Sequence, residues 1–121
     1  MIPASRWREK KELRDVGIVA ILQDNTILND VYELVFGSND IAYKIFGING
    51  NFREIKPRSV LLDFDNLDIL NMVVSNISRT DNNPRLVYYG LAPEEIAERL
   101  IQDKIEYIRY GDWKGLVEAL K

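Results

Sequence analysis

Two aspartates that follow short apolar runs are the residues best placed to do chemistry in this chain. Asp63 ends the run Val60–Leu62, and Asp24 follows the run Ile18–Leu22 with only Gln23 between them. Short runs of β-branched and leucine residues are typical of strands that are buried on both faces of a parallel sheet. Ligands and reacting groups sit at the carboxyl ends of such strands. If the two strands are neighbours, we expect the two carboxylates to converge at one edge of the sheet.

The composition limits the chemistry available to these carboxylates. The chain of 121 residues contains no cysteine and no histidine, which excludes disulfides, thiolate nucleophiles and the commonest general base. A bound metal would have to be a hard cation with oxygen ligands. The net charge of −3 is mild, so nucleic acid is not an expected partner of this domain.

The overall composition is that of an ordinary globular protein. Hydrophobic residues make up 46% and charged residues 29% of the chain, and the length suits one domain. No apolar run is long enough to span a bilayer, and the N-terminal residues lack the apolar core of a signal peptide. We therefore expect a cytoplasmic protein without a membrane partner.

Strand-like and helix-like segments alternate along the chain. Strands are predicted at residues 18–22, 41–48, 60–62, 86–89 and 105–108. The segment 52–56 has room for only about one helical turn. The other intervals carry apolar residues at helical spacing, which we expect to be buried: Ile27, Leu28, Val31, Leu34 and Val35; Leu67, Leu70, Val73, Val74 and Ile77; Ile96, Ala97, Leu100 and Ile101; and Trp113, Leu116, Val117 and Leu120.

This order predicts an α/β fold. Strands that alternate with helices form a parallel sheet with right-handed crossovers and helices on both faces, which gives three layers. The second helix would be stunted. Residues 1–16 are predicted to form a helical extension that precedes the domain of residues 17–121. That extension is interpreted as a solvated helix lying on the domain, or alternatively as a linker or a partner-binding helix.

Four stretches of the chain resemble the receiver domains of two-component response regulators. The run from Val19 to Asn25 resembles the first strand of the family, Tyr43–Gly50 the second, Lys56–Asp63 the third and Glu106–Gly111 the fifth. The resemblance covers roughly residues 18–121 and implies a flavodoxin-like, receiver-like fold with strand order 2-1-3-4-5.

The resemblance also implies a set of functional positions. Receivers accept a phosphoryl group on an aspartate with the help of Mg²⁺, which offsets the charge of the phosphate. Asp63 stands at the phosphoacceptor position and Asp24 at the second acid of the metal-binding pair. A metal site that survives here would use Asp24, Asp63 and a backbone carbonyl near Asp65, with Mg²⁺ as its ion and otherwise no cofactor.

The chain departs from the receiver pattern at three positions. Gln23 replaces the first acid, Gly90 replaces the switch serine or threonine, and Tyr110 replaces the lysine. Arg109 stands one residue early and, on a strand, points to the opposite face.

We therefore interpret the chain as a pseudo-receiver, a non-enzymatic signalling module that works through protein contacts without an aspartyl-phosphate switch. Two alternatives stay open. The first is a receiver that is still phosphorylated on Asp63 with Mg²⁺. The second is a small-ligand binder that uses the acidic pocket at the strand ends.

The aromatic residues late in the chain have two interpretations, packing at a sheet edge or an interaction face. In receivers the face formed by the fourth helix, fifth strand and fifth helix commonly mediates dimerisation or output binding. Tyrosine and tryptophan are favoured at interfaces. We expect Tyr110 to be partly exposed and, with Trp113, to border the contact surface for a partner or a second copy.

Overall fold

The computed structural model describes residues 18–48, 56–78 and 84–121. The predicted extension of residues 1–16 lies outside the described residues. So does the predicted helical turn at residues 52–56, apart from Lys56.

Five parallel strands form the centre of the described domain. They are β1 (Val19–Gln23), β2 (Tyr43–Gly47), β3 (Ser59–Asp63), β4 (Arg85–Gly90) and β5 (Glu106–Arg109). Their order in the sheet is β2-β1-β3-β4-β5, which confirms the predicted topology. β1 is therefore flanked by β2 and β3, and its register places Gln23 opposite Asp63.

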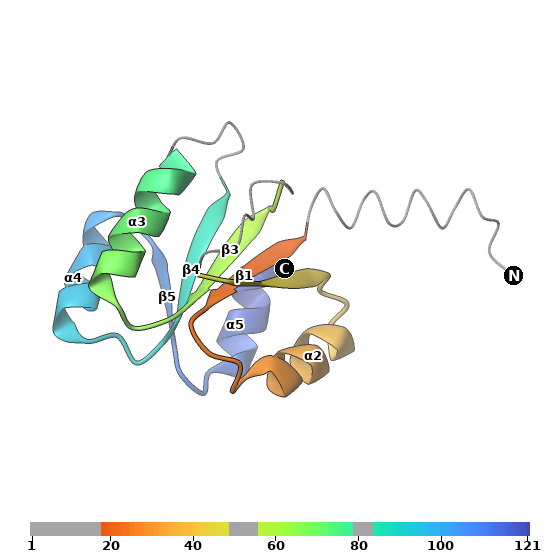
Figure 1. Cartoon of the computed structure of the whole chain (residues 1–121). Helices are drawn as coiled ribbons and strands as arrows, with labels where there is room; N and C mark the ends of the chain where they lie inside the picture. Colours follow the sequence, from red (N-terminus) through yellow and green to blue (C-terminus); the bar gives the residue numbers. More distant parts are fainter. Residues whose placement is uncertain (1–17, 49–55, 79–83) are drawn as a thin grey trace, which may run out of the picture.

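The described helices form the two outer layers. They are α2 (Asn29–Ser38), α3 (Leu67–Ser78), α4 (Glu94–Gln102) and α5 (Trp113–Leu120). Helices α2 and α5 cover one face of the sheet, and α3 and α4 cover the other (Figure 1). The fold is flavodoxin-like. None of the described helices is long and apolar enough to cross a membrane.

Strands β1, β3 and β4 are largely buried on both faces, as the apolar runs predicted, whereas the edge strands β2 and β5 are partly exposed. Val19, Ile21, Leu61 and Val87 pack beneath α2 and α5, whereas Leu62 packs beneath α3 and α4. All five side chains have no solvent-exposed surface. The prediction that these strands form the core is confirmed.

The buried face of α2 differs from the predicted one. Tyr32 and Phe36 are fully buried, whereas Ile27 and Leu34 are 80% and 70% exposed. The helix turns its two aromatic side chains to the sheet because they stack on each other, with ring centroids 5.5 Å apart, and cover more apolar surface than the aliphatic residues. In α4 Ile101 is also exposed, since only Ile96 and Leu100, four residues apart, face the core.

Side-chain caps fix the starts of two helices close to the carboxyl edge of the sheet. The Oδ1 atom of Asn66 accepts a hydrogen bond of 3.1 Å from the backbone N–H of Ile69, and Oδ1 of Asp112 accepts one of 3.0 Å from Gly115. These bonds satisfy N–H groups that have no partner within their own helix. The loops that follow β3 and β5 are thereby anchored beside the candidate site.

Candidate functional site

A small acidic cleft lies at the carboxyl edge of the sheet, where β1, β3 and β4 end. Its volume is about 170 Å³. The structure brings four of the predicted site residues to this cleft, and Gln23 and Tyr110 are not part of its lining. The lining residues are Asp24, Asn25, Asp63, Phe64, Asp65, Tyr88, Tyr89, Gly90 and Leu91.

Asp63 makes a hydrogen bond that the sequence did not predict. The hydroxyl of Tyr32 donates to Oδ2 of Asp63 at 2.7 Å. Tyr32 is fully buried on α2, between Phe36 and the indole of Trp113, whose centroid lies 6.2 Å from the phenol ring. One carboxylate oxygen of Asp63 is therefore bound by a phenol that the core holds in place.

The protonation of this pair follows from its burial. Burial raises the pKa of Asp63 above its ordinary value of 3.8, the hydrogen bond from Tyr32 lowers it, and the charge of Asp24 raises it again. Burial also raises the pKa of Tyr32, and the hydrogen bond to Asp63 adds to that rise. The phenol therefore keeps its proton and remains the donor.

Gln23 lies next to Asp63 in the sheet and is almost completely buried. Only 6% of its surface is exposed, and its amide oxygen Oε1 makes no hydrogen bond to any described residue. The residue beside Asp63 on the neighbouring strand is therefore a neutral, enclosed amide. A buried polar atom without a partner costs about 1–3 kcal/mol, so Gln23 does not add to stability through this oxygen.

Two tyrosines tie the loops around the cleft to neighbouring strands. The hydroxyl of Tyr107 donates to the carbonyl of Gly90 at 2.8 Å and accepts from the N–H of Ala92 at 3.0 Å. The hydroxyl of Tyr89 accepts from the N–H of Gly111 at 2.8 Å. The loop after β4 is thereby fixed to β5, and the loop after β5 is fixed to β4.

Tyr88 forms the wall of the cleft on the α3 and α4 side. Its ring stacks on that of Tyr107 at 5.7 Å between centroids, and the side chain is almost fully buried. Burial, followed by the charge of Asp65, raises the pKa of Tyr88 to about 12. This phenol is therefore neutral at physiological pH.

Tyr110 and Trp113 lie against Tyr89 on the face of the sheet that α2 and α5 cover. Both rings pack against Tyr89, with centroid distances of 5.7 and 4.9 Å. Tyr110 is 52% exposed, which confirms that it is at least partly exposed, whereas Trp113 is half-buried against the core. Tyr110 thus packs against the phenol of Tyr89 and does not line the cleft.

The cleft is rich in carboxylates, and the described residues that line it include no Lys, Arg, Ser or Thr. Among the residues that the structure describes, no three acidic side chains come together as a group that could hold a metal ion. Asp24, Asp63 and Asp65 share the cleft and are spread along its walls.

The sequence did not predict Tyr32 as part of the site, and it predicted Tyr89 and Tyr107 only as packing or interface residues, without the hydrogen bonds that they make to the loops. Tyr32 carried one usable signal, because it is four residues from both Leu28 and Phe36 and therefore belongs to an apolar helical face. The hydrogen bonds of the other two tyrosines depend on how β4 and β5 pair, which no local pattern encodes.

No family model and no curated protein matches this chain.

Proposed function

We propose that this domain is a pseudo-receiver, a signalling and interaction module that works through protein contacts without an aspartyl-phosphate switch. The hydrogen bond from Tyr32 to Asp63 carries the proposal. It occupies an oxygen of the phosphoacceptor side chain from within the core.

The charges in the cleft support the same reading. A phosphoryl group on Asp63 would add negative charge to a cleft that already contains Asp24 and Asp65 and no lysine or arginine. Phosphoryl transfer depends on cations that neutralise the developing charge. The loops at Gly90 and Tyr110 are also fixed by tyrosine hydroxyls and backbone bonds, which opposes the movement that a switch requires.

Apolar side chains outside the core support the interaction role. Ile101 on α4, Leu91 after β4, Tyr107 on β5 and Tyr110 directly after β5 are exposed. Aromatic and aliphatic residues of this kind are enriched at protein interfaces. We propose that a protein partner or a second copy binds the face formed by α4, β5 and α5.

Each alternative function has one observation in its favour. Asp24 and Asp63 line the same cleft, and the second oxygen of Asp63 makes no hydrogen bond to a described residue, as a phosphorylatable receiver requires. The cleft of about 170 Å³ would also admit a ligand of a few atoms, although it is smaller than the roughly 300–1,000 Å³ of ordinary ligand pockets.

The proposal is tested by offering the protein a phosphoryl donor. The full chain is incubated with acetyl phosphate over a range of Mg²⁺ concentrations, and its intact mass is followed. We expect no stable phosphoryl adduct. A mass increase of one phosphoryl group that is absent in Asp63→Asn would overturn the pseudo-receiver assignment and establish the phosphorylatable alternative.

A further inference from the structure

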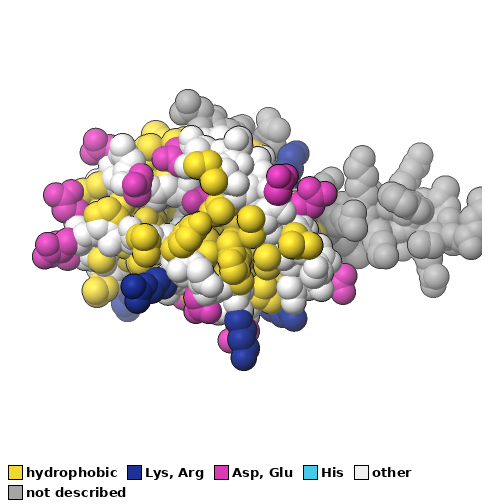
Figure 2. All heavy atoms as spheres, turned by 90° about the horizontal axis from the view of Figure 1, so that it is seen from below, with side chains coloured by type: hydrophobic (Ala, Val, Ile, Leu, Met, Phe, Trp, Pro, Cys, Tyr) yellow, Lys and Arg dark blue, Asp and Glu magenta, His cyan; other side chains and the backbone are white. Residues whose placement is uncertain are grey.

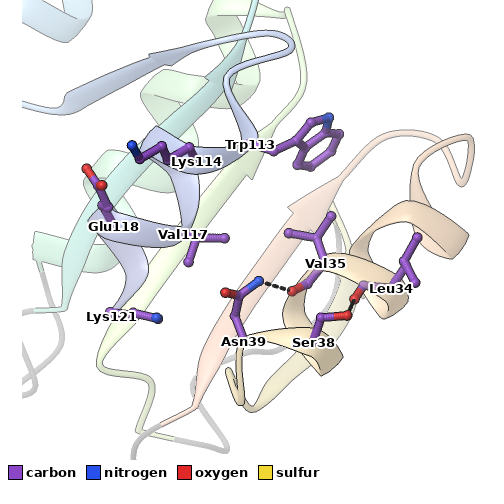
Figure 3. Close-up of a pocket in the computed structure, with 9 residues that line it drawn as sticks. All are labelled: Leu34, Val35, Ser38, Asn39, Trp113, Lys114, Val117, Glu118 and Lys121. Carbon is purple, nitrogen blue, oxygen red and sulfur yellow. Dashed lines mark hydrogen bonds between the residues drawn. The ribbon is translucent and has the colours of Figure 1, made fainter.

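A groove between α2 and α5 is separate from the acidic cleft. Its volume is about 500 Å³, and Val35 on α2 and Val117 on α5 form opposite walls of it, with Trp113 towards one end (Figure 3). Ser38, Asn39 and Lys121 lie towards the other end. Leu34 borders the groove and is 70% exposed. Figure 2 shows that hydrophobic side chains also gather in the middle of the face of the molecule seen from below.

The described chain begins beside the Lys121 end of this groove. The backbone N–H of Arg58 donates to the carbonyl of Ile18 at 3.0 Å, and its guanidinium donates to the carbonyl of Lys121 at 3.0 Å. The backbone N–H of Val19 donates to Ala42, three residues after Asn39. Residues 1–17 therefore join the domain next to one end of the groove.

The length and the apolar residues of segment 1–17 suit the groove. A helix over the predicted extension of residues 1–16 would be about 24 Å long, enough to run along the whole of α5, whose eight residues span about 12 Å. Leu13 and Val16 are three residues apart and would share one side of such a helix. They are the apolar residues of the segment that lie nearest to Ile18.

The segment and the rest of the chain carry net charges of opposite sign. Residues 1–17 carry five basic and three acidic side chains, a net charge of +2, and because the whole chain carries −3 the remaining residues carry −5. The lining of the groove itself is mixed, with Lys114, Lys121 and Glu118. The place where the segment joins the domain and the apolar residues of the segment are therefore what favour the groove.

We infer that residues 2–16 bind in the α2–α5 groove of their own molecule, with Leu13 and Val16 packed against Leu34, Val35 and Val117. Binding within one molecule is favoured over binding between copies because the covalent connection at Ile18 gives the segment a high effective concentration at the groove. This inference does not depend on the proposed function, since it uses none of the residues of the acidic cleft.

The absence of cysteine from the chain makes a direct test available. A nitroxide spin label is attached to the single cysteine of a full-length Lys10→Cys variant, and the intensities of backbone amide signals are measured by NMR. We expect the amides of α2 and α5 to lose most of their intensity, whereas those of α3 and α4, on the opposite face of the sheet, keep theirs.

Two exposed positions provide the variant and its matched control. Leu34→Asp in the groove should restore the α2 and α5 signals, whereas Ile101→Asp on α4, which is 80% exposed, should leave the losses unchanged. Both side chains lie outside the core, so both variants should fold.

Three outcomes would overturn the inference. The first is undiminished α2 and α5 signals in the labelled protein, and the second is an equal loss over all faces of the domain. The third is a loss that also occurs when spin-labelled protein is mixed with unlabelled, isotope-enriched protein, because the groove would then be filled by the segment of a second copy.

Discussion

The carboxylate of Asp63, on the central sheet, accepts a hydrogen bond from the phenol of Tyr32, on helix α2 in the outer layer. The phenol of Tyr32 lowers the pKa of Asp63, while burial and the charge of Asp24 raise it. The pKa of Asp63 therefore reflects two effects that raise it and one that lowers it, and single substitutions can remove the hydrogen bond from Tyr32 or the charge of Asp24.

Replacing Tyr32 by phenylalanine should remove the hydrogen bond and leave the ring in place. We expect the pKa of Asp63 to rise further, followed through the ¹³C shift of its carboxyl carbon. The free energy of unfolding at neutral pH should fall by about 1.5 kcal/mol, the lower end of the range for hydrogen bonds to charged groups, because Asp63 is partly exposed.

Tyr43→Phe is the matched control for this substitution. Tyr43 contacts the same aromatic group through Phe36, and its hydroxyl makes no hydrogen bond to any described residue. This control should leave the titration of Asp63 unchanged. An equal effect of the two substitutions on Asp63 would show that the phenol of Tyr32 does not act through its hydrogen bond.

The raised pKa of Asp63 makes stability depend on pH. Between 3.8 and the raised value, the folded protein holds this proton more tightly than the unfolded chain does. The stability that Asp63 contributes is therefore complete below 3.8 and is lost as the pH rises through the folded pKa. The Asp63→Asn variant has no carboxyl group at this position, so its stability lacks this dependence on pH.

Urea unfolding of wild type and Asp63→Asn over a pH series measures this effect. The unfolding free energy of wild type minus that of the variant should decrease from acidic to neutral pH. A difference that is constant or increases with pH would contradict the assignment of a raised pKa to Asp63.

At the scale of the elements, the loop between β4 and α4 is held by the hydroxyl of Tyr107. Removing this hydroxyl in Tyr107→Phe should expose the N–H of Ala92, which donates to it, and should leave the carbonyl of Gly90 with only its bond from Tyr110. We expect faster amide hydrogen exchange at Ala92, because local opening of the loop no longer breaks a hydrogen bond at this group.

Tyr110→Phe serves as the control for the loop experiment. The Tyr110 side chain is 52% exposed, and its hydroxyl makes no hydrogen bond to any residue of the described ranges. Exchange at Ala92 should therefore match wild type in this variant. Unchanged exchange in Tyr107→Phe would show that other contacts hold the loop.

The core strand β3 should respond strongly to truncation. Leu62 is fully buried between β1 and β4 beneath α3 and α4, so Leu62→Ala should lower the free energy of unfolding by about 2–5 kcal/mol. Leu91→Ala removes the same atoms from a side chain that is largely exposed and should cost far less. A loss below about 0.5 kcal/mol in Leu62→Ala would contradict its place in the core.

The positions of the strands and helices could be predicted from the sequence better than the face that each helix buries. The apolar runs located every described strand to within a few residues. For β1, β3 and β4 this follows from burial on both faces, which needs apolar side chains at nearly every position. For helix α2 the predicted buried face was right only in part, because Leu28 and Val35 pack against the core, whereas Ile27 and Leu34 are exposed and Tyr32 and Phe36 are buried in addition. Its sequence contains both an aliphatic and an aromatic set at helical spacing, and the choice between them depends on the volume available beneath the helix.

The candidate site could be predicted only in part, because some of its contacts depend on how helices pack on the sheet. Asp24, Asp63, Asp65 and Gly90 follow strands, so parallel topology is enough to bring them to one cleft. Tyr32 reaches Asp63 because α2 packs across β1 and β3. That contact joins residues 31 positions apart, which local patterns do not relate.

For the whole molecule, the order of strands was predictable because alternating strands and helices leave few topologies. The resemblance to receivers selected the order 2-1-3-4-5, which the structure confirms. The sheet has β2 and β5 at its edges, and both are short, with exposed Lys44 on one and Arg109 on the other. Charged edge strands discourage sheets from joining between molecules.

The position of β1 between β2 and β3 has a consequence for the kinetics of folding. Val19 pairs with Ser59, forty residues later in the sequence, and β1 cannot complete its pairing until the chain has passed through α2 and β2. Closing such a loop costs entropy before any contact compensates for it. Pulse-labelled hydrogen exchange should therefore detect protection in the helices before protection across the β1–β3 pair, and the barrier to folding should lie where that pair closes.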